Sequence, residues 1–157
     1  MNEIVTVAGY MLTQAIDTIE RKGFLNPFFS GFDKDDKLVT FTCTDISLEL
    51  SIPKIIRKFE SNEKNLKCAA IAYPAEIEDA YGNRESVIIV MVQNYTTDEY
   101  LMIFQPYERK DGKLEVYKYE LLNFSPKLVD KLDEMEECFI QGALKYDDAN
   151  HIWSERF

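Results

Sequence analysis

Apolar and polar positions along the chain predict helices at its ends and β-strands between them. Apolar residues recur every three or four positions over residues 3–21, and Gly23 follows them. This spacing predicts an amphipathic helix that ends at the glycine. Extended apolar residues before Asp33–Lys37 and a return segment at Leu38–Cys43 then predict a first hairpin.

Four further β-like segments, joined by short turns, span about residues 66–122. Their ranges are Leu66–Ile77, Glu85–Tyr95, Tyr100–Tyr107 and Leu114–Leu122. Residues 87–92 are apolar at every position, which indicates a strand covered on both faces, since a half-exposed strand alternates. Asp111-Gly112 between alternating runs is a strong hairpin signal. These segments predict a four-strand antiparallel meander.

The stretch between hairpin and meander fits two structures. Asp45 could cap a helix, whereas the apolar positions of residues 46–52 alternate as they do in a strand. We predict a middle helix over residues 52–61, with Ser51 as its cap and Pro53 in its first turn. For the preceding residues, the sequence fits either a helix or a strand.

The expected fold follows from these elements. Ser125-Pro126 predicts the start of a C-terminal helix by the same capping argument. The fold class is α+β, with an antiparallel sheet of four to six strands and with N-terminal, middle and C-terminal helices. We expect a single globular domain over residues 1–157, with residues 146–157 as a candidate flexible tail.

A register with turn residues at the hairpin tips assigns the side chains of the meander to two faces. One face is rich in aromatic and sulfur-containing residues: Val87, Ile89, Met91, Gln93, Tyr95, Tyr100, Met102, Phe104, Tyr117, Tyr119 and Leu121. The other is aliphatic at its centre: Ile71, Tyr73, Ile77, Ile88, Val90, Val92, Leu101, Ile103, Tyr107 and Val116. The first face suits a groove or partner surface because tyrosine combines large contact area with a polar tip. The alternative is that the three helices cover both faces.

Charge and cysteine usage narrow the class of protein. Lys+Arg number 18 against Asp+Glu 28, a net charge of −10, which disfavours nucleic acid and anionic lipid as partners. No stretch approaches the ~20 apolar residues of a membrane span. Cys43, Cys68 and Cys138 are odd in number and widely spaced, so they predict reduced thiols in a cytoplasmic protein.

Catalytic, metal and cofactor motifs are missing from the sequence. The one histidine, His151, lies in the polar tail, where it is poorly placed to act as a base. Asp33-x-Asp35-Asp36 does not continue as a calcium loop, because Leu38 and Thr44 stand where glycine and glutamate are needed. The isolated glycines form no phosphate-binding motif. We therefore predict no catalytic residue, no metal site and no cofactor.

The densest polar group on the predicted sheet contains Glu76, Glu78 and Asp79. Paired carboxylates could act as acid and base, or hold Mg²⁺ through water. The alternative is a charged rim that prevents edge-to-edge pairing.

Three functions fit this sequence. The leading hypothesis is a non-enzymatic protein-binding module of adaptor, chaperone or inhibitor/immunity type, with a basic protein or a second copy of itself as partner. Its expected contacts are Tyr95, Tyr100, Tyr117, Tyr119 and Trp153. An alternative is a small-molecule-binding domain or low-profile enzyme with a pocket between sheet and helix, in which Gln93, Tyr117, Glu76 and Glu78 are the polar points. The other alternative is a nucleic-acid-mimic inhibitor that uses the acidic residues between 130 and 137.

Overall fold

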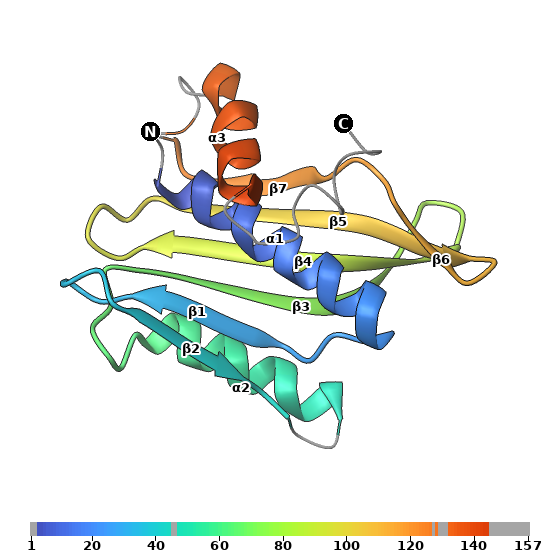
Figure 1. The fold of residues 1–157 in the computed structure, drawn as a ribbon, viewed down its shortest axis with the longest axis horizontal. Helices are drawn as coiled ribbons and strands as arrows, with labels where there is room; N and C mark the ends of the chain where they lie inside the picture. The colour runs from blue at the N-terminus through green and yellow to red at the C-terminus, as the bar shows by residue number, and fades with distance from the viewer. Residues whose placement is uncertain (1–2, 45–46, 127, 129–131, 145–157) are drawn as a thin grey trace.

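The computed structural model describes residues 3–44, 47–126, 128 and 132–144, and Figure 1 shows their arrangement. Its elements follow in the order α1 (Glu3–Lys22), β1 (Phe28–Phe32), β2 (Leu38–Thr42), α2 (Leu48–Ser61), β3 (Cys68–Glu78), β4 (Arg84–Asn94), β5 (Tyr100–Lys110), β6 (Lys113–Val116), β7 (Glu120–Phe124) and α3 (Leu132–Leu144). No helix in this part of the chain has the length and apolar character needed to cross a membrane.

All strands pair antiparallel in one sheet, which confirms the α+β class. The strand order is β2-β1-β3-β4-β5-β6, and β7 pairs with β5 beyond the end of β6. The sheet has seven strands where four to six were expected, because the last predicted strand is divided in two. All three predicted helices are present.

One face of the sheet is covered by α1, and we call it the α1 face. The helix contacts β3, β4 and β5, and α3 packs against α1. Figure 1 shows α1 running across the sheet, with α3 beside its first turns. Ile88, Val90 and Val92 of β4 belong to the core on this side. The helix ends as predicted at Gly23, which adopts φ 84° and donates its N–H to the Ile19 carbonyl.

The opposite face carries α2, and we call it the α2 face. This helix contacts β3 and β1, and Lys58 lies over the Phe41 ring of β2, so the helix covers the β1 side of the sheet. Ile55 and Phe59 are its buried apolar residues, and they pack against Phe29, Ile71 and Tyr73. Both faces of the apolar run in β4 are therefore covered in its middle, as the unbroken pattern predicted.

The middle helix begins four residues earlier than predicted. Its N-cap is Ser47, which is extended and makes no side-chain capping bond, whereas Ser51 is a buried residue inside the helix. Pro53 also lies inside the helix rather than in its first turn. The alternation of residues 48–52 was misleading, because the spacing from Leu48 to Ile52 also fits one side of a helix.

The last predicted strand is broken at Tyr117–Tyr119 into β6 and β7. Pro106 of β5 has no N–H to offer a neighbouring strand there. Tyr117 still donates its N–H to the Pro106 carbonyl at 3.1 Å. The Gln105 side-chain amide donates to the Tyr117 carbonyl, so a side chain replaces a ladder bond. The prediction was wrong here because it treated the alternating run as one strand.

Face assignments in β3 and around β7 were also wrong. Ile71 and Tyr73 pair with Met91 and Ile89 and lie on the α2 face, and Ile77 follows them by alternation. The turn after β3 runs from Asp79 to Asn83, so β3 is shifted by three residues from the assumed register, and a shift by an odd number exchanges the faces of a strand. Tyr119 packs against the core of the α1 face and Leu121 pairs with Ile103 of that core, because the strand break interrupts the alternation.

Ser125, the predicted cap of the C-terminal helix, is buried, and its hydroxyl accepts the Tyr100 backbone N–H at 3.3 Å, so it ties the end of β7 to β5. The Leu128 N–H is donated to the Ser125 carbonyl in a helical turn directly after it. The described part of the C-terminal helix is α3, Leu132–Leu144, and residues 129–131 before it lie outside the described residues. The predicted tail at 146–157 lies outside the described residues.

Candidate functional site

The predicted contact residue Tyr95 is part of the structure that holds α2 on the sheet. Its hydroxyl donates to the Phe59 carbonyl near the end of α2, and the two rings lie 6.2 Å apart between centroids. Burial raises the pKa of this phenol above its ordinary value. Tyr95 is therefore engaged in packing and is not an open contact.

The other predicted tyrosines are separated. Tyr119 is half-buried on the α1 face, where burial raises its pKa. Tyr100 lies opposite Gln93 across β4 and β5 and is 36% exposed. Tyr117 is exposed, and its phenol donates to Glu108 at 2.7 Å. This bond raises the pKa of Tyr117 and lowers the pKa of Glu108.

The predicted carboxylates Glu76 and Glu78 lie at the end of the sheet opposite to Tyr100. Glu76 is 3.2 Å from the guanidinium of Arg84, and Glu78 pairs in register with the same residue. All three side chains are exposed, so the ion pair contributes little to stability. Ser86 pairs with Glu76, and it lies about 23 Å from Gln93 along β4. Gln93 therefore belongs to a different region, and Trp153 lies outside the described residues.

A hollow between α2 and the sheet is the first candidate site, and we call it the α2 groove. It has a volume of about 620 Å³ and is mostly apolar, with acidic residues at its rim. Its lining residues are Leu48, Glu49, Ile52, Pro53, Pro74, Ala75, Glu76, Ser86 and Tyr107. Leu48 is 45% exposed, which makes it an available apolar contact.

The α2 groove exists because β1 is shorter than β3. β1 pairs with β3 from Cys68 to Ala72, and residues 73–78 continue beyond it. The first turns of α2 approach this free part of β3 and form the second wall of the groove. The site therefore depends on the difference in length between β1 and β3, which no local sequence motif predicts.

The free edge of β3 is protected against pairing with another strand. Asp79 donates its N–H to Asn83 across the β3–β4 turn, so alternation directs the backbone groups of residues 74, 76 and 78 outward. Position 74 is proline, which has no N–H, and the other two are glutamates. These are features that block strand addition. A ligand in the α2 groove would thus be held by side-chain contacts.

A second hollow, which we call the arginine pocket, adjoins the α2 groove. It has a volume of about 550 Å³ and lies where α1 ends. Its lining residues are Gly23, Arg84, Glu85, Ser86, Tyr107, Glu108, Arg109 and Tyr117. Ser86 and Tyr107 line both hollows, so the two are adjacent, and together we call them the depression.

The charges of the arginine pocket are largely matched within the protein. Arg109 donates to the Ile19 carbonyl at 2.6 Å and so completes the last turn of α1. Arg84 pairs with Glu76. Burial raises the pKa of Tyr107, which keeps this phenol neutral and suited to hydrogen bonding. The depression is apolar at its α2 end and polar at its α1 end.

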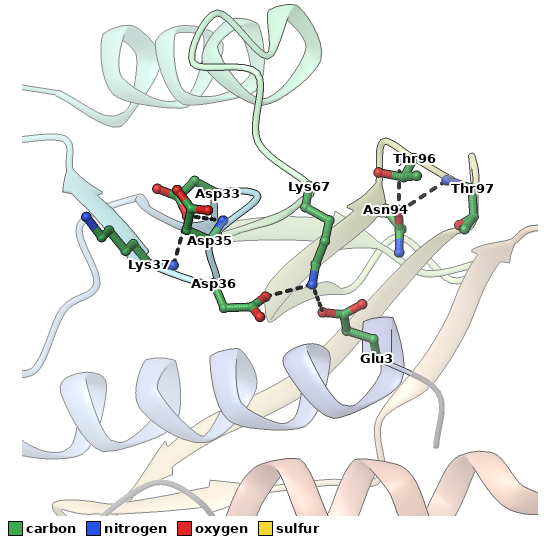
Figure 2. Close-up of polar contacts among 9 residues, drawn as sticks. All are labelled: Glu3, Asp33, Asp35, Asp36, Lys37, Lys67, Asn94, Thr96 and Thr97. Atoms are coloured by element: carbon green, nitrogen blue, oxygen red, sulfur yellow. Dashed lines mark hydrogen bonds and ion pairs between the residues drawn. The ribbon is translucent and has the colours of Figure 1, made fainter.

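The opposite end of the sheet carries a polar cluster that stabilises the turns (Figure 2). Lys67 lies 2.7 Å from Asp36 and 3.5 Å from Glu3, and the bond to Asp36 is the main reason that its pKa is raised. Asp33 accepts the N–H groups of residues 35 and 37, and Asn94 accepts those of residues 96 and 97. The carboxylates of Asp33 and Asp36 at this hairpin tip thus bind other groups of the protein itself.

A third hollow lies between α1 and the first hairpin, and we call it the hairpin pocket. It has a volume of about 270 Å³ and is lined by Thr6, Val7, Tyr10, Met11, Ser30, Phe32 and Leu38. None of these lining residues is charged, and Ser30 among them is buried.

Sequence reasoning found Glu76 and Tyr117 but missed the residues that give the depression its apolar half. Leu48, Ile52 and Pro53 lie in or beside the stretch that stayed open between helix and strand. Pro74 within a strand was the available signal, since proline in a sheet marks a free edge.

Comparisons with protein families, with characterised proteins and with solved structures give no match to this chain. Across the described residues, no group of three or more His, Cys, Asp or Glu side chains is placed to hold a metal ion. The functional argument therefore rests on the geometry of the hollows.

Proposed function

We propose that the protein is a non-enzymatic protein-binding module that takes an extended segment of a partner into the α2 groove and the arginine pocket. The observation that carries this proposal is that the two hollows are adjacent and share Ser86 and Tyr107 in their linings. A long, open depression with an apolar end and a polar end suits a peptide segment better than a compact metabolite, which is usually largely enclosed.

Charge supports a partner segment that carries basic residues. Glu49 and Glu76 stand at the apolar end, and the protein has a net charge of −10. Apolar side chains of the segment would contact Leu48 and Ile52, and a lysine or arginine beside them would meet the carboxylates. Electrostatic complementarity of this kind favours encounter and orientation of the partner.

The test begins with a random 12-residue peptide library displayed on phage and selected against the immobilised protein. Selected peptides are then titrated by fluorescence anisotropy against Leu48→Gln and Leu50→Gln variants. Both leucines are exposed residues of α2, but only Leu48 lines the groove. We expect Leu48→Gln to weaken binding by about tenfold, or ~1.4 kcal/mol, and Leu50→Gln to leave it unchanged.

A second pair of variants tests the charge argument. Glu76→Gln should weaken binding of peptides that carry lysine or arginine, whereas Glu63→Gln, at an exposed site between α2 and β3, should not. Equal binding to all four variants, or selection of peptides without apolar residues, would contradict the proposal.

The hairpin pocket favours a second candidate function, binding of a small uncharged ligand. Its lining is apolar except for hydroxyl groups, and buried Ser30 offers a hydrogen bond to a ligand. Titration with the uncharged fluorescent apolar probe Nile red against wild type and Leu38→Glu tests it. Loss of probe binding in the variant supports this function, and unchanged binding contradicts it.

A further inference from the structure

The outer edge of β2 differs from every other free edge of the described sheet. β2 is the outermost strand on its side, and its five residues Leu38–Thr42 include no charged residue, no proline and no glycine. The free part of β3 has a proline and two glutamates, β6 has Lys113 and Glu115, and β7 has Glu120 and a register shift. Proteins use such features to prevent edge pairing, and β2 has none of them.

The hairpin geometry shows which residues of β2 direct their backbone groups outward. Asp33 donates its N–H to the Lys37 carbonyl, and Cys43 donates to the Pro27 carbonyl. Residues 37 and 43 thus face β1, and by alternation so do Val39 and Phe41. The N–H and C=O groups of Leu38, Thr40 and Thr42 point away from the sheet.

We propose that β2 pairs antiparallel with β2 of a second copy of this chain, about a twofold axis at Thr40. In this register Thr40 lies opposite Thr40 of the second copy, and Leu38 lies opposite Thr42. Each outward residue then meets an outward residue, which allows about six ladder hydrogen bonds. A twofold interface uses the same patch on both copies, so the register must be self-complementary, as it is here.

The side chains of β2 fit the same register. Val39 would lie opposite Phe41 of the second copy on the α2 face, and a β-branched residue beside an aromatic one is a favourable cross-strand pair. Leu38, which is 54% exposed, would be covered on the other face. Self-pairing brings no like charges together within the strand, although each copy carries a net charge of −10. This inference does not depend on the proposed peptide groove.

Disulfide cross-linking tests the register directly. Directly opposed Cα atoms of a hydrogen-bonded antiparallel pair lie about 5.5 Å apart, within the range that a disulfide spans. Thr40→Cys should therefore give a covalent dimer of twice 18.3 kDa on mild oxidation with copper phenanthroline. Leu38→Cys is the matched control on the same edge, because the two copies of residue 38 would lie about 13 Å apart.

The oligomeric state provides the second test. Light scattering and sedimentation should give the dimer mass for wild type at about 100 μM and above. Thr40→Lys should give the monomer mass, whereas Asn123→Lys, at an exposed position of β7, should remain dimeric. A monomeric wild type, a Thr40→Lys variant that stays dimeric, or equal cross-linking of the two cysteine variants would overturn the proposal. Circular dichroism establishes that each variant is folded.

Discussion

The two faces of the sheet are covered by helices that are buried to very different extents. Twelve of the twenty residues of α1 are buried, because this helix lies between the sheet and α3. Only three of the fourteen residues of α2 are buried, and the main contacts of this helix are with β3 and β1. The middle of the α1 face is thus a closed core, whereas the first turns of α2 are loosely packed and leave the α2 groove beside them.

The difference shows how stability and binding can be divided within one sheet. Small residues allow the helices of the closed side to approach closely, since Gly142 of α3 lies directly against the Thr6 backbone of α1. The open side has larger side chains in partial contact, among them Leu48, Ile52 and Met91. Each of the following predictions tests this division.

The largest effect is expected for truncation in the closed core. Ile16 in α1 is fully buried, whereas Ile52 in α2 is partly exposed at the groove. Ile16→Ala should lower the free energy of unfolding by about 2–5 kcal/mol. Ile52→Ala should cost less than half as much, because its surroundings are partly solvated already. Urea unfolding of both variants measures the difference. Equal losses of unfolding free energy would show that the two helices are packed equally tightly.

The next largest effect concerns the contact between α1 and α3. A Cβ atom at position 142 would lie 1.8 Å from the Thr6 carbonyl oxygen, so the helices must separate to admit it. Gly142→Ala should therefore destabilise the protein by about 1–3 kcal/mol despite the better helix propensity of alanine. The exposed neighbour Gln141→Ala is the control, expected within about 0.5 kcal/mol of wild type. If Gly142→Ala is as stable as wild type, α3 does not pack closely against α1.

A pH dependence is expected from Cys68, which lies in the core of the α1 face. Burial, and to a lesser extent the nearby Glu3 carboxylate, raises the pKa of this thiol from 9.0 to about 12. The unfolded chain loses the thiol proton near pH 9 while the folded protein keeps it. The protonated Cys68 thiol thus makes its full contribution to the free energy of unfolding below pH 9. This contribution falls as the pH rises toward 12, by up to about 1.4 kcal/mol per pH unit.

Urea midpoints at pH 8, 9 and 10 measure this slope in wild type and in Cys68→Ala. The comparison stops at pH 10 because tyrosines ionise in the unfolded chain above that value. Wild type should lose more stability than the variant over this interval. Identical slopes would mean that water reaches the thiol and that the core is less closed than the structure indicates.

The smallest effect is expected on the open side. Tyr95→Phe removes the hydroxyl that donates to the Phe59 carbonyl and should cost about 1 kcal/mol. Tyr100→Phe is the control, since its exposed ring should change stability by no more than about 0.5 kcal/mol. Thermal unfolding of both variants measures the effect. If the two losses are equal, Tyr95 does not hold α2 on the sheet.

Local patterns predicted the elements of this fold well. The helical period of residues 3–21, the turn at Asp33–Lys37 and the apolar run at 87–92 each led to an element that the structure contains. Errors arose where an element depends on a distant partner. The broken strand at Tyr117 depends on Pro106 across the sheet, and the position of α2 depends on the burial of Ile55 and Phe59 against β1 and β3.

The candidate site was predictable only in fragments. Glu76 and Tyr117 were selected as polar residues of a pocket between sheet and helix, and both line the depression. Tyr95 and Tyr119 were expected contacts, but the first is held against α2 and the second packs toward α1. Gln93 was grouped with Glu76, although the sheet places them at opposite ends.

The sequence by itself therefore determined the α+β class, the order of helices and strands and the burial of the central strand, because hydrophobic period and turn residues act over a few positions. Tertiary structure alone decided the strand order, the faces of β3, the α2 groove and the arginine pocket. Those features depend on register and on the relative lengths of β1 and β3, and a shift of one residue between distant strands exchanges the buried and exposed faces.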